Sequence, residues 1–223
     1  MSLGSELFVS DLDRFLINPN LVVTTLGHAA MAEGLDEVEL IKLASEAETR
    51  GESFDAWQYI ESRYSLDQTK AIENRFIEQA KIEPIKYEDA NVFLNYLDTN
   101  FIPNLILTMG NKKWQEIKLK AAGEDSRPYL ITNQKSKGKI IRSWQNDQGL
   151  FVPPQEIIRV SAPRVNQGDD KKVSFEDFPW DYGKGILLQR PNERRLTSQS
   201  GDIDLRVIIV DSLLEIIEHL KTV

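Results

Sequence analysis

The feature that most constrains the fold is one strand-like run that stands far from all the others. Residues 7–10 (Leu-Phe-Val-Ser) are typical of a short buried strand, whereas residues 20–98 show helical patterns and no convincing strand. Strands and helices alternate after residue 104, which favours a mainly parallel sheet covered on both faces. A helical insertion directly after the first strand of an α/β domain explains this order.

The expected elements follow from hydrophobic spacing and from helix-end residues. Ser65 and Gln68 fit a capping box, and Gly51 and Gly123 are suitable helix ends. The later strands are expected at residues 104–110, 128–132, 156–162, 184–190 and 205–212. Helices are expected at residues 36–51, 53–64, 65–82, 87–97, 112–123, 138–145 and 212–221. We therefore predict a Rossmann-like α/β core of residues 1–18 and 99–223, interrupted by an all-helical cap of residues 19–98.

Composition narrows the class of protein. No apolar run approaches the roughly 20 residues that span a bilayer, and no basic region with a long apolar stretch marks a secretory signal. The absence of cysteine excludes disulfides and thiolate metal sites, so a cytoplasmic setting is expected. The formal net charge of -8 argues against a nucleic-acid partner, which needs a basic face.

Two aspartates directly behind the first strand are the leading candidates for chemistry. In parallel sheets, ligands bind outside the carboxyl ends of the strands, where Asp11 and Asp13 lie. Residues i and i+2 of an extended segment point the same way, so the two carboxylates are expected to converge. Together they can hold Mg²⁺, and one can attack a phosphorus atom. Aspartate is also an ordinary turn and cap residue, which is the competing interpretation.

Three further features strengthen the functional interpretation. Thr108 ends an apolar run before a glycine-containing turn, where its hydroxyl can bind a phosphoryl oxygen. Lys137 precedes a short predicted helix and can offset carboxylate and phosphate charge, although Lys135 and Lys139 compete for this role. Asp169 and Asp170 follow the strand expected at residues 156–162 and can supply further metal ligands. Each feature alone is also compatible with a structural or solvated role.

Taken in order, "FVSDLDRFL", "LILTMG", "SKGK" and "GDDKK" resemble the motifs of the haloacid dehalogenase-like (HAD) hydrolases. The resemblance covers nearly the whole chain, because the helical insertion resembles the cap of that superfamily. It implies a Mg²⁺-dependent phosphatase that works through an aspartyl-phosphate.

The resemblance also implies a role for each candidate residue. Asp11 would be the nucleophile and Asp13 the general acid and base. Thr108 would bind the phosphoryl group, and Lys137 would stabilise the nucleophile and the phosphate. The adjacent acids 169 and 170 would hold Mg²⁺ together with Asp11 and the backbone carbonyl of Asp13.

Two departures from the family pattern keep a second interpretation open. Phe15 stands where the family usually has threonine or valine, and the residues before Asp169 are polar instead of apolar. Both features would fit a catalytically degenerate protein with a ligand-binding or regulatory role. A metal-free haloacid dehalogenase is a further alternative, against which the acids at 169 and 170 argue.

The cap is expected to set specificity by covering the site and excluding water. Its aromatic residues Trp57, Tyr59, Tyr64 and Phe76 are interpreted as helix-packing residues. A lidded site suits a small phosphorylated metabolite, and the chain is expected to be a monomer or a homodimer without a nucleic-acid or membrane partner.

Overall fold

A parallel β-sheet forms the centre of the computed structural model, which describes residues 2–3, 6–50, 54–191 and 204–221. In this described part, six strands pair in the order β4-β3-β2-β6-β7-β8, and every pairing is parallel. The strands are β2 (Leu7–Ser10), β3 (Asn104–Met109), β4 (Tyr129–Thr132), β6 (Val165–Asp169), β7 (Gly183–Leu188) and β8 (Ile208–Val210). The predicted Rossmann-like α/β class is confirmed.

The order of the strands creates a switch point beside β2. From β2 the chain adds β3 and β4 on one side, and it then adds β6, β7 and β8 on the other side. In open parallel sheets, ligands bind at the carboxyl ends of the strands next to such a reversal. The ends of β2, β3 and β6 are therefore the part of the sheet best placed for a site.

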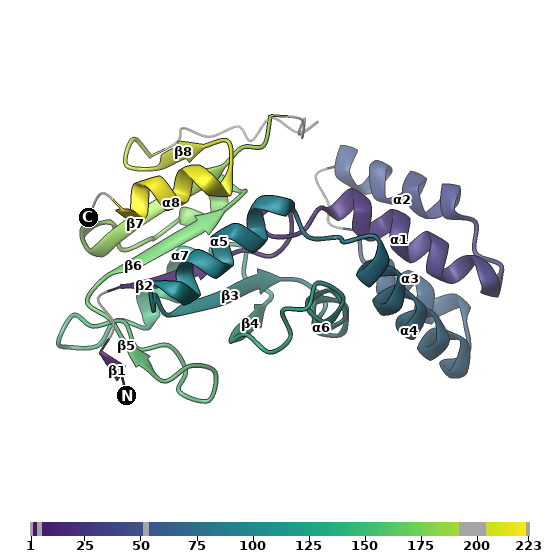
Figure 1. The fold of residues 1–223 in the computed structure, drawn as a ribbon, viewed down its shortest axis with the longest axis horizontal. Coiled ribbons are helices and arrows are strands. Elements are labelled where there is room, and N and C mark those ends of the chain that lie inside the picture. Colours follow the sequence, from purple (N-terminus) through teal and green to yellow (C-terminus); the bar gives the residue numbers. More distant parts are fainter. Residues whose placement is uncertain (1, 4–5, 51–53, 192–203, 222–223) are drawn as a thin grey trace.

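Side chains of the sheet alternate between two apolar layers, as the period of a strand requires. Phe8 and Ile106 lie in the layer under α5 (Glu88–Thr99), α6 (Lys112–Ala121) and α8 (Leu213–Lys221). Leu7 and Val9 lie in the opposite layer, with Ile141 of α7 (Lys137–Ser143). Figure 1 shows α5 and α8 side by side in front of the sheet. The sheet is thus covered on both faces, as expected.

Four helices form a separate group beside the carboxyl ends of the strands (Figure 1). They are α1 (Pro19–Ala30), α2 (Glu37–Thr49), α3 (Ala56–Arg63) and α4 (Leu66–Ile82). The predicted capping box is confirmed: the Ser65 side chain accepts from the backbone N–H of Gln68, and the Gln68 side chain accepts from the backbone of Ser65. Gly51, the expected end of α2, lies outside the described residues.

The two chain segments that connect this helical group to the sheet run side by side. Ile17 and Lys86 form an antiparallel bridge. The Asn18 N–H donates to the Ile85 carbonyl over 2.9 Å, and the Tyr87 N–H donates to the Leu16 carbonyl over 3.0 Å. The chain therefore leaves and re-enters the α/β part at one place.

Helix α5 departs from the predicted division of the chain, which assigns residues 19–98 to the cap. Phe93 of α5 makes an edge-to-face contact with Phe8 of β2, at 5.1 Å between ring centroids. Helix α5 also packs against α8 on the face of the sheet (Figure 1). The helical group beside the sheet is accordingly α1–α4, and α5 covers the sheet.

The prediction of a strand at residues 156–162 is largely wrong. Only β5 (Val160–Ser161) is extended there, and it pairs with β1 (Ser2–Leu3) outside the main sheet. The strand that leads to Asp169 is β6, whose sequence VNQGD is polar yet buried along its whole length. Short 3-10 helices complete the chain at Met31–Glu33, Lys172–Phe175 and Trp180–Tyr182.

Helix α6 connects the sheet to the helical group. Its Trp114 ring stacks on Trp57 of α3 at 5.9 Å and lies 5.6 Å from Phe76 of α4. Lys113 of α6 forms a 2.9 Å ion pair with Glu73 of α4. Trp57 and Phe76 are therefore packing residues, as interpreted from the sequence.

Among the residues described, none of the helices is both long enough and apolar enough to cross a bilayer.

Candidate active site

Three buried carboxylates meet at the ends of two neighbouring strands. Asp11 follows β2, and Asp169 and Asp170 lie at the end of β6, which pairs with β2. The Asp11 N–H donates to the Gly168 carbonyl over 2.9 Å, which continues this pairing. One oxygen from each carboxylate lies within 4.8 Å of the others. This spacing brings together three hard oxygen donors of the kind that Mg²⁺ prefers.

Lys137 joins this cluster from the first turn of α7. Its Nζ lies 2.6 Å from Asp11 Oδ1 and 2.7 Å from Asp169 Oδ2, and the side chain is buried. The competing candidates Lys135 and Lys139 are exposed. The structure therefore brings Lys137, and neither of its rivals, to the carboxylates.

The residue after Lys137 explains how the lysine comes so close. A Cβ at Gly138 would lie 2.5 Å from the Glu176 carbonyl oxygen and 2.8 Å from the Phe178 nitrogen. Both distances are too short for any larger side chain, so glycine allows α7 to pack directly against this segment. This close approach holds the first turn of α7 at the edge of the carboxylate cluster.

Burial and charge act in opposite directions on these groups. Burial raises the pKa of Asp11, and the nearby carboxylate of Asp169 adds to this, whereas the charge of Lys137 lowers it. The net pKa of Asp11 lies above its ordinary value. Burial lowers the pKa of Lys137, but the two carboxylates outweigh burial and hold it above its usual range. Lys137 is thus a permanently charged partner of the acids.

A second lysine lies near the same cluster. The backbone N–H of Lys171 donates to Asp169 Oδ1 over 2.9 Å. Although burial opposes its charge, the carboxylates of Asp170, Asp11 and Asp169 raise the pKa of Lys171. Two ammonium groups therefore offset part of the negative charge of the three carboxylates.

Asp13 lies beside the cluster and not within it. The chain turns after Asp11, and the Asp13 side chain contacts α6: its oxygens lie 2.6 and 2.5 Å from Lys118 Nζ, and Gln115 Nε2 donates to Oδ2 over 3.3 Å. The expectation that the two carboxylates converge on one cation is therefore wrong for the Asp13 side chain. The extended i, i+2 geometry does not apply because the loop folds back, with Leu16 N–H donating to the Leu12 carbonyl.

Burial alone would raise the pKa of Asp13, but the charge and hydrogen bonds of Lys118 outweigh it, so the net pKa is lowered.

The sequence patterns did not indicate Lys118 and Gln115 as site residues. Their spacing of three residues puts them on one face of α6, but lysine on an amphipathic helix normally indicates a solvated face. Here both side chains are only 3% exposed.

Thr108 lies at the end of β3 and is buried. Its hydroxyl donates to Gln115 Oε1 over 3.3 Å, and Gln115 Nε2 also donates to the Met109 carbonyl over 3.0 Å. Gln115 thereby connects Thr108 with Asp13.

Phe15 does not crowd the site. Its side chain is fully buried and makes an edge-to-face contact with Phe93 of α5, at 6.1 Å between centroids. A Cβ on Gly168 of β6 would lie only 2.2 Å from the Phe15 ring. The ring thus fills the space that glycine leaves open, and Phe15 belongs to the core beneath the loop.

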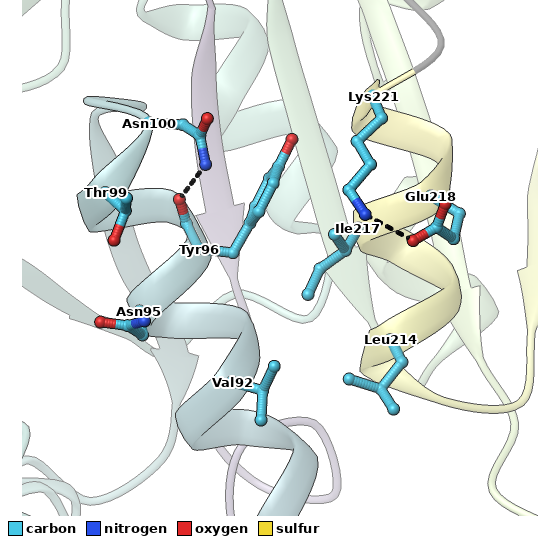
Figure 2. Close-up of a pocket in the computed structure, with 9 residues that line it drawn as sticks. All are labelled: Val92, Asn95, Tyr96, Thr99, Asn100, Leu214, Ile217, Glu218 and Lys221. Atoms are coloured by element: carbon cyan, nitrogen blue, oxygen red, sulfur yellow. Dashed lines mark hydrogen bonds and ion pairs between the residues drawn. The ribbon is translucent and has the colours of Figure 1, made fainter.

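A groove with a volume of about 460 Å³ lies elsewhere, between α5 and α8 (Figure 2). Thr99 and Asn100 in its wall come shortly before β3 begins, so the groove extends towards the opposite end of the sheet from the carboxylates. Its charged residues Glu218 and Lys221 pair with each other at 2.7 Å. The candidate active site is accordingly the carboxylate cluster.

Solved structures share this fold. A structure described as a haloacid dehalogenase-like hydrolase from Burkholderia xenovorans LB400 has a TM-score of 0.61 and 16% identity, and covers 96% of this chain and 98% of its own. A HAD phosphatase from Thermococcus onnurineus has a TM-score of 0.54 and 16% identity, with 96% and 97% covered. A HAD-type hydrolase from Bacillus subtilis, described as bound to magnesium, has a TM-score of 0.58 and 10% identity, with 96% and 98% covered.

No protein-family model and no curated protein matches the sequence. The solved structures nevertheless share the arrangement of sheet and helices over nearly their whole length. The chain therefore has the fold of the HAD-like hydrolases, and the predicted resemblance is confirmed at the level of the fold.

Proposed function

We propose that this protein is a Mg²⁺-dependent phosphohydrolase that acts on a small phosphorylated metabolite through an aspartyl-phosphate on Asp11. The observation that carries the proposal is the cluster of Asp11, Asp169 and Asp170, with Lys137 bonded to Asp11 and Asp169. A carboxylate at the end of a central strand, held by a cation and flanked by further acids, suits nucleophilic attack on phosphorus.

The metal fits the chemistry of the donors. Asp11, Asp169 and Asp170 would hold Mg²⁺, since each offers a hard oxygen ligand from a buried position. When bound, the ion neutralises phosphate charge that would otherwise repel the attacking carboxylate. The Bacillus subtilis structure, described as bound to magnesium, is a further argument for this metal.

Each residue then has a defined task. A carboxylate oxygen of Asp11 attacks phosphorus, and the bond from phosphorus to the leaving oxygen breaks. Against the effect of burial, Lys118 lowers the pKa of Asp13, so this group is mostly ionised at rest. Its protonated fraction gives a proton to the leaving oxygen, and the carboxylate that remains takes one from the water that attacks the aspartyl-phosphate and releases phosphate and Asp11. Lys137 keeps Asp11 oriented. The Thr108 hydroxyl turns from Gln115 Oε1, to which it donates in the free protein, and donates to a phosphoryl oxygen instead.

Helices α1–α4 would act as a lid that favours small substrates. The net charge of -8 argues against a nucleic-acid substrate. A cytoplasmic enzyme that is a monomer or a homodimer fits the sequence.

Two alternatives receive less support. Structures described as dehalogenases share the fold, for example one with a TM-score of 0.52 and 14% identity. The carboxylate cluster favours metal-dependent phosphoryl chemistry instead. A catalytically degenerate protein would be consistent with Phe15 and with the polar residues before Asp169 if these disturbed the site. The former lies in the core and the latter form strand β6, so neither argues for a disabled site.

The decisive experiment is hydrolysis of 4-nitrophenyl phosphate by the wild-type protein and by Asp11→Asn, with Mg²⁺ and with a chelator. We expect turnover that needs Mg²⁺ and falls at least about 1,000-fold in Asp11→Asn, as loss of a covalent nucleophile typically does. The turnover rate should fall about 100-fold or more in Asp13→Asn, and it should fall less in Thr108→Ala. Asp147→Asn, an exposed loop residue, is the matched control and should retain full activity.

A binding readout accompanies the kinetics. Mg²⁺ should raise the melting temperature of the wild-type protein, by an amount that follows the ratio of Mg²⁺ concentration to Kd. The shift should shrink in Asp170→Asn. Full activity in purified Asp11→Asn, or equal activity with chelator, would refute the proposed mechanism.

A further inference from the structure

Helix α6 sends two buried polar side chains towards the loop that follows β2. Lys118 and Gln115 are each 3% exposed, and a lysine is rarely that buried unless it is paired. The partner of Lys118 is Asp13, whose two carboxylate oxygens lie 2.6 and 2.5 Å from Nζ. Because both oxygens accept from one ammonium group, the carboxylate is held in a single orientation.

The helix that carries Lys118 is itself firmly held. The Asn111 side chain accepts from the Trp114 N–H at the start of α6, and the Trp114 ring packs against both Trp57 and Phe76. The Lys118 ammonium lies 5.6 Å from the centroid of the Trp114 ring. A side chain that projects from a packed helix positions its partner better than one on a loop does.

Gln115 restrains the same carboxylate from a second direction. Its Nε2 donates to Asp13 Oδ2 and to the Met109 carbonyl, and its Oε1 accepts from the Thr108 hydroxyl. Thr108 lies at the end of β3, next to β2 in the sheet. The acid, the hydroxyl and the buried lysine therefore form one hydrogen-bonded group at the edge of the carboxylate cluster.

We propose that Lys118 is a positioning residue for the hydrolysis: it holds the carboxylate of Asp13 in the orientation from which this group serves the leaving oxygen and then the attacking water. The inference rests on the proposed function, because it gives Asp13 its acid and base roles. Lys118 acts through Asp13 and does not bind the phosphoryl group.

This role predicts a specific kinetic pattern for Lys118→Met, which keeps the length of the side chain and removes the ammonium group. The kcat should fall about 10- to 100-fold, as misplacement of a catalytic group does, while KM changes less than about 2-fold. The loss should be larger for an alkyl phosphate than for 4-nitrophenyl phosphate, because an alkoxide leaving group depends more on a proton. Lys118→Arg should recover most of the activity.

A double-mutant cycle separates positioning from general damage to the fold. In the Asp13→Asn background, Lys118→Met should lower kcat by less than about 2-fold, because the carboxylate that Lys118 positions is already absent. The double variant also removes both charges of the pair, so it remains informative if Lys118→Met alone folds poorly. Lys120→Met, an exposed lysine on the same helix, is the matched control and should retain wild-type kinetics.

Each other outcome refutes a distinct statement. Equal losses from Lys118→Met in the wild-type and Asp13→Asn backgrounds would show a structural role and refute positioning. A large rise in KM in Lys118→Met would mean that Lys118 contacts the substrate. Greater activity of Lys118→Met on alkyl phosphates would mean that Lys118 inhibits Asp13 instead of positioning it. No Mg²⁺-dependent turnover by the wild-type protein would refute the phosphohydrolase proposal itself, and with it the role of Lys118.

Discussion

At the scale of single residues, the Phe15 ring fills the space that the absent side chain of Gly168 leaves. Phe15 is fully buried, and its ring lies where a Cβ on residue 168 would have to be. Gly168 in turn is the residue of β6 whose carbonyl accepts from the Asp11 N–H. The packing of this pair therefore supports the backbone from which two of the site carboxylates project.

Gly168→Ala tests this complementarity. The new methyl group would overlap the Phe15 ring, at 2.2 Å in the present geometry, so we expect a loss of about 1–3 kcal/mol in the free energy of unfolding. The double variant Gly168→Ala/Phe15→Leu should lose less than the sum of the two single variants, because leucine vacates the contested space. Urea unfolding of the four proteins measures this. Strictly additive losses would mean that the two residues do not compete for space.

The predictable part of the site is the part that follows from strand ends. The position of Asp11 behind an apolar strand predicts its place in the site, and the position of Lys137 before a short helix does the same. Lys118 and Gln115 could not be predicted, because they lie within a helix and not at a strand or helix end, and their partner Asp13 lies more than a hundred positions away along the chain. No local pattern shows that a helix face rich in lysine turns inward.

At the scale of elements, one ion pair connects α5 to the segment that follows β7. Both guanidinium NH groups of Arg190, just after β7, donate to Asp89 of α5, over 3.0 and 2.9 Å. Arg190 also lies 3.6 Å from the Tyr87 ring centroid and donates to the Phe15 carbonyl. The Leu213 N–H at the start of α8 donates to Asp89 as well. This pair therefore joins α5, β7 and α8 to both connections of the helical group.

Removing one partner of this pair should be costly. Arg190→Met leaves the Asp89 carboxylate, whose side chain is 14% exposed, without its cation. We expect a loss of about 3 kcal/mol in the free energy of unfolding, typical of an uncompensated buried charge. Asp89→Asn/Arg190→Met should recover part of this loss, and Arg206→Met, an exposed arginine near Asp204, should cost much less. A loss below about 0.5 kcal/mol in Arg190→Met would contradict the structural role.

The sequence predicts an element well where its hydrophobic period and its caps agree, and poorly where pairing with a distant segment decides the secondary structure. The polar sequence of β6 is stable as a central strand because β2 and β7 pair with it on both sides. Its side chains bond to partners outside the strand: Asn166 Nδ2 donates to Glu6 over 2.7 Å, and Gln167 Nε2 donates to the Ser174 carbonyl over 3.1 Å. Likewise, the helical period of α5 shows an apolar face but not that it covers the sheet.

At the scale of the whole molecule, helices α1–α4 are connected to the sheet at one place and packed against helix α6 at another. The connections meet at the bridge between Ile17 and Lys86, and the packing centres on Trp114 of α6. This arrangement predicts that the helical group can loosen as a unit while the sheet stays intact.

Trp114→Ala should separate the two parts. Truncating a buried tryptophan typically costs about 3–5 kcal/mol, and here the loss falls on the contacts with Trp57 and Phe76. We expect faster amide hydrogen exchange in α3 and α4 and little change in β2, β3 and β6. Trp180→Ala, on the opposite layer beside Phe175 and Phe178, should leave exchange in α3 and α4 unchanged. A uniform acceleration across helices and sheet in Trp114→Ala would instead mean that the whole molecule opens as one cooperative unit.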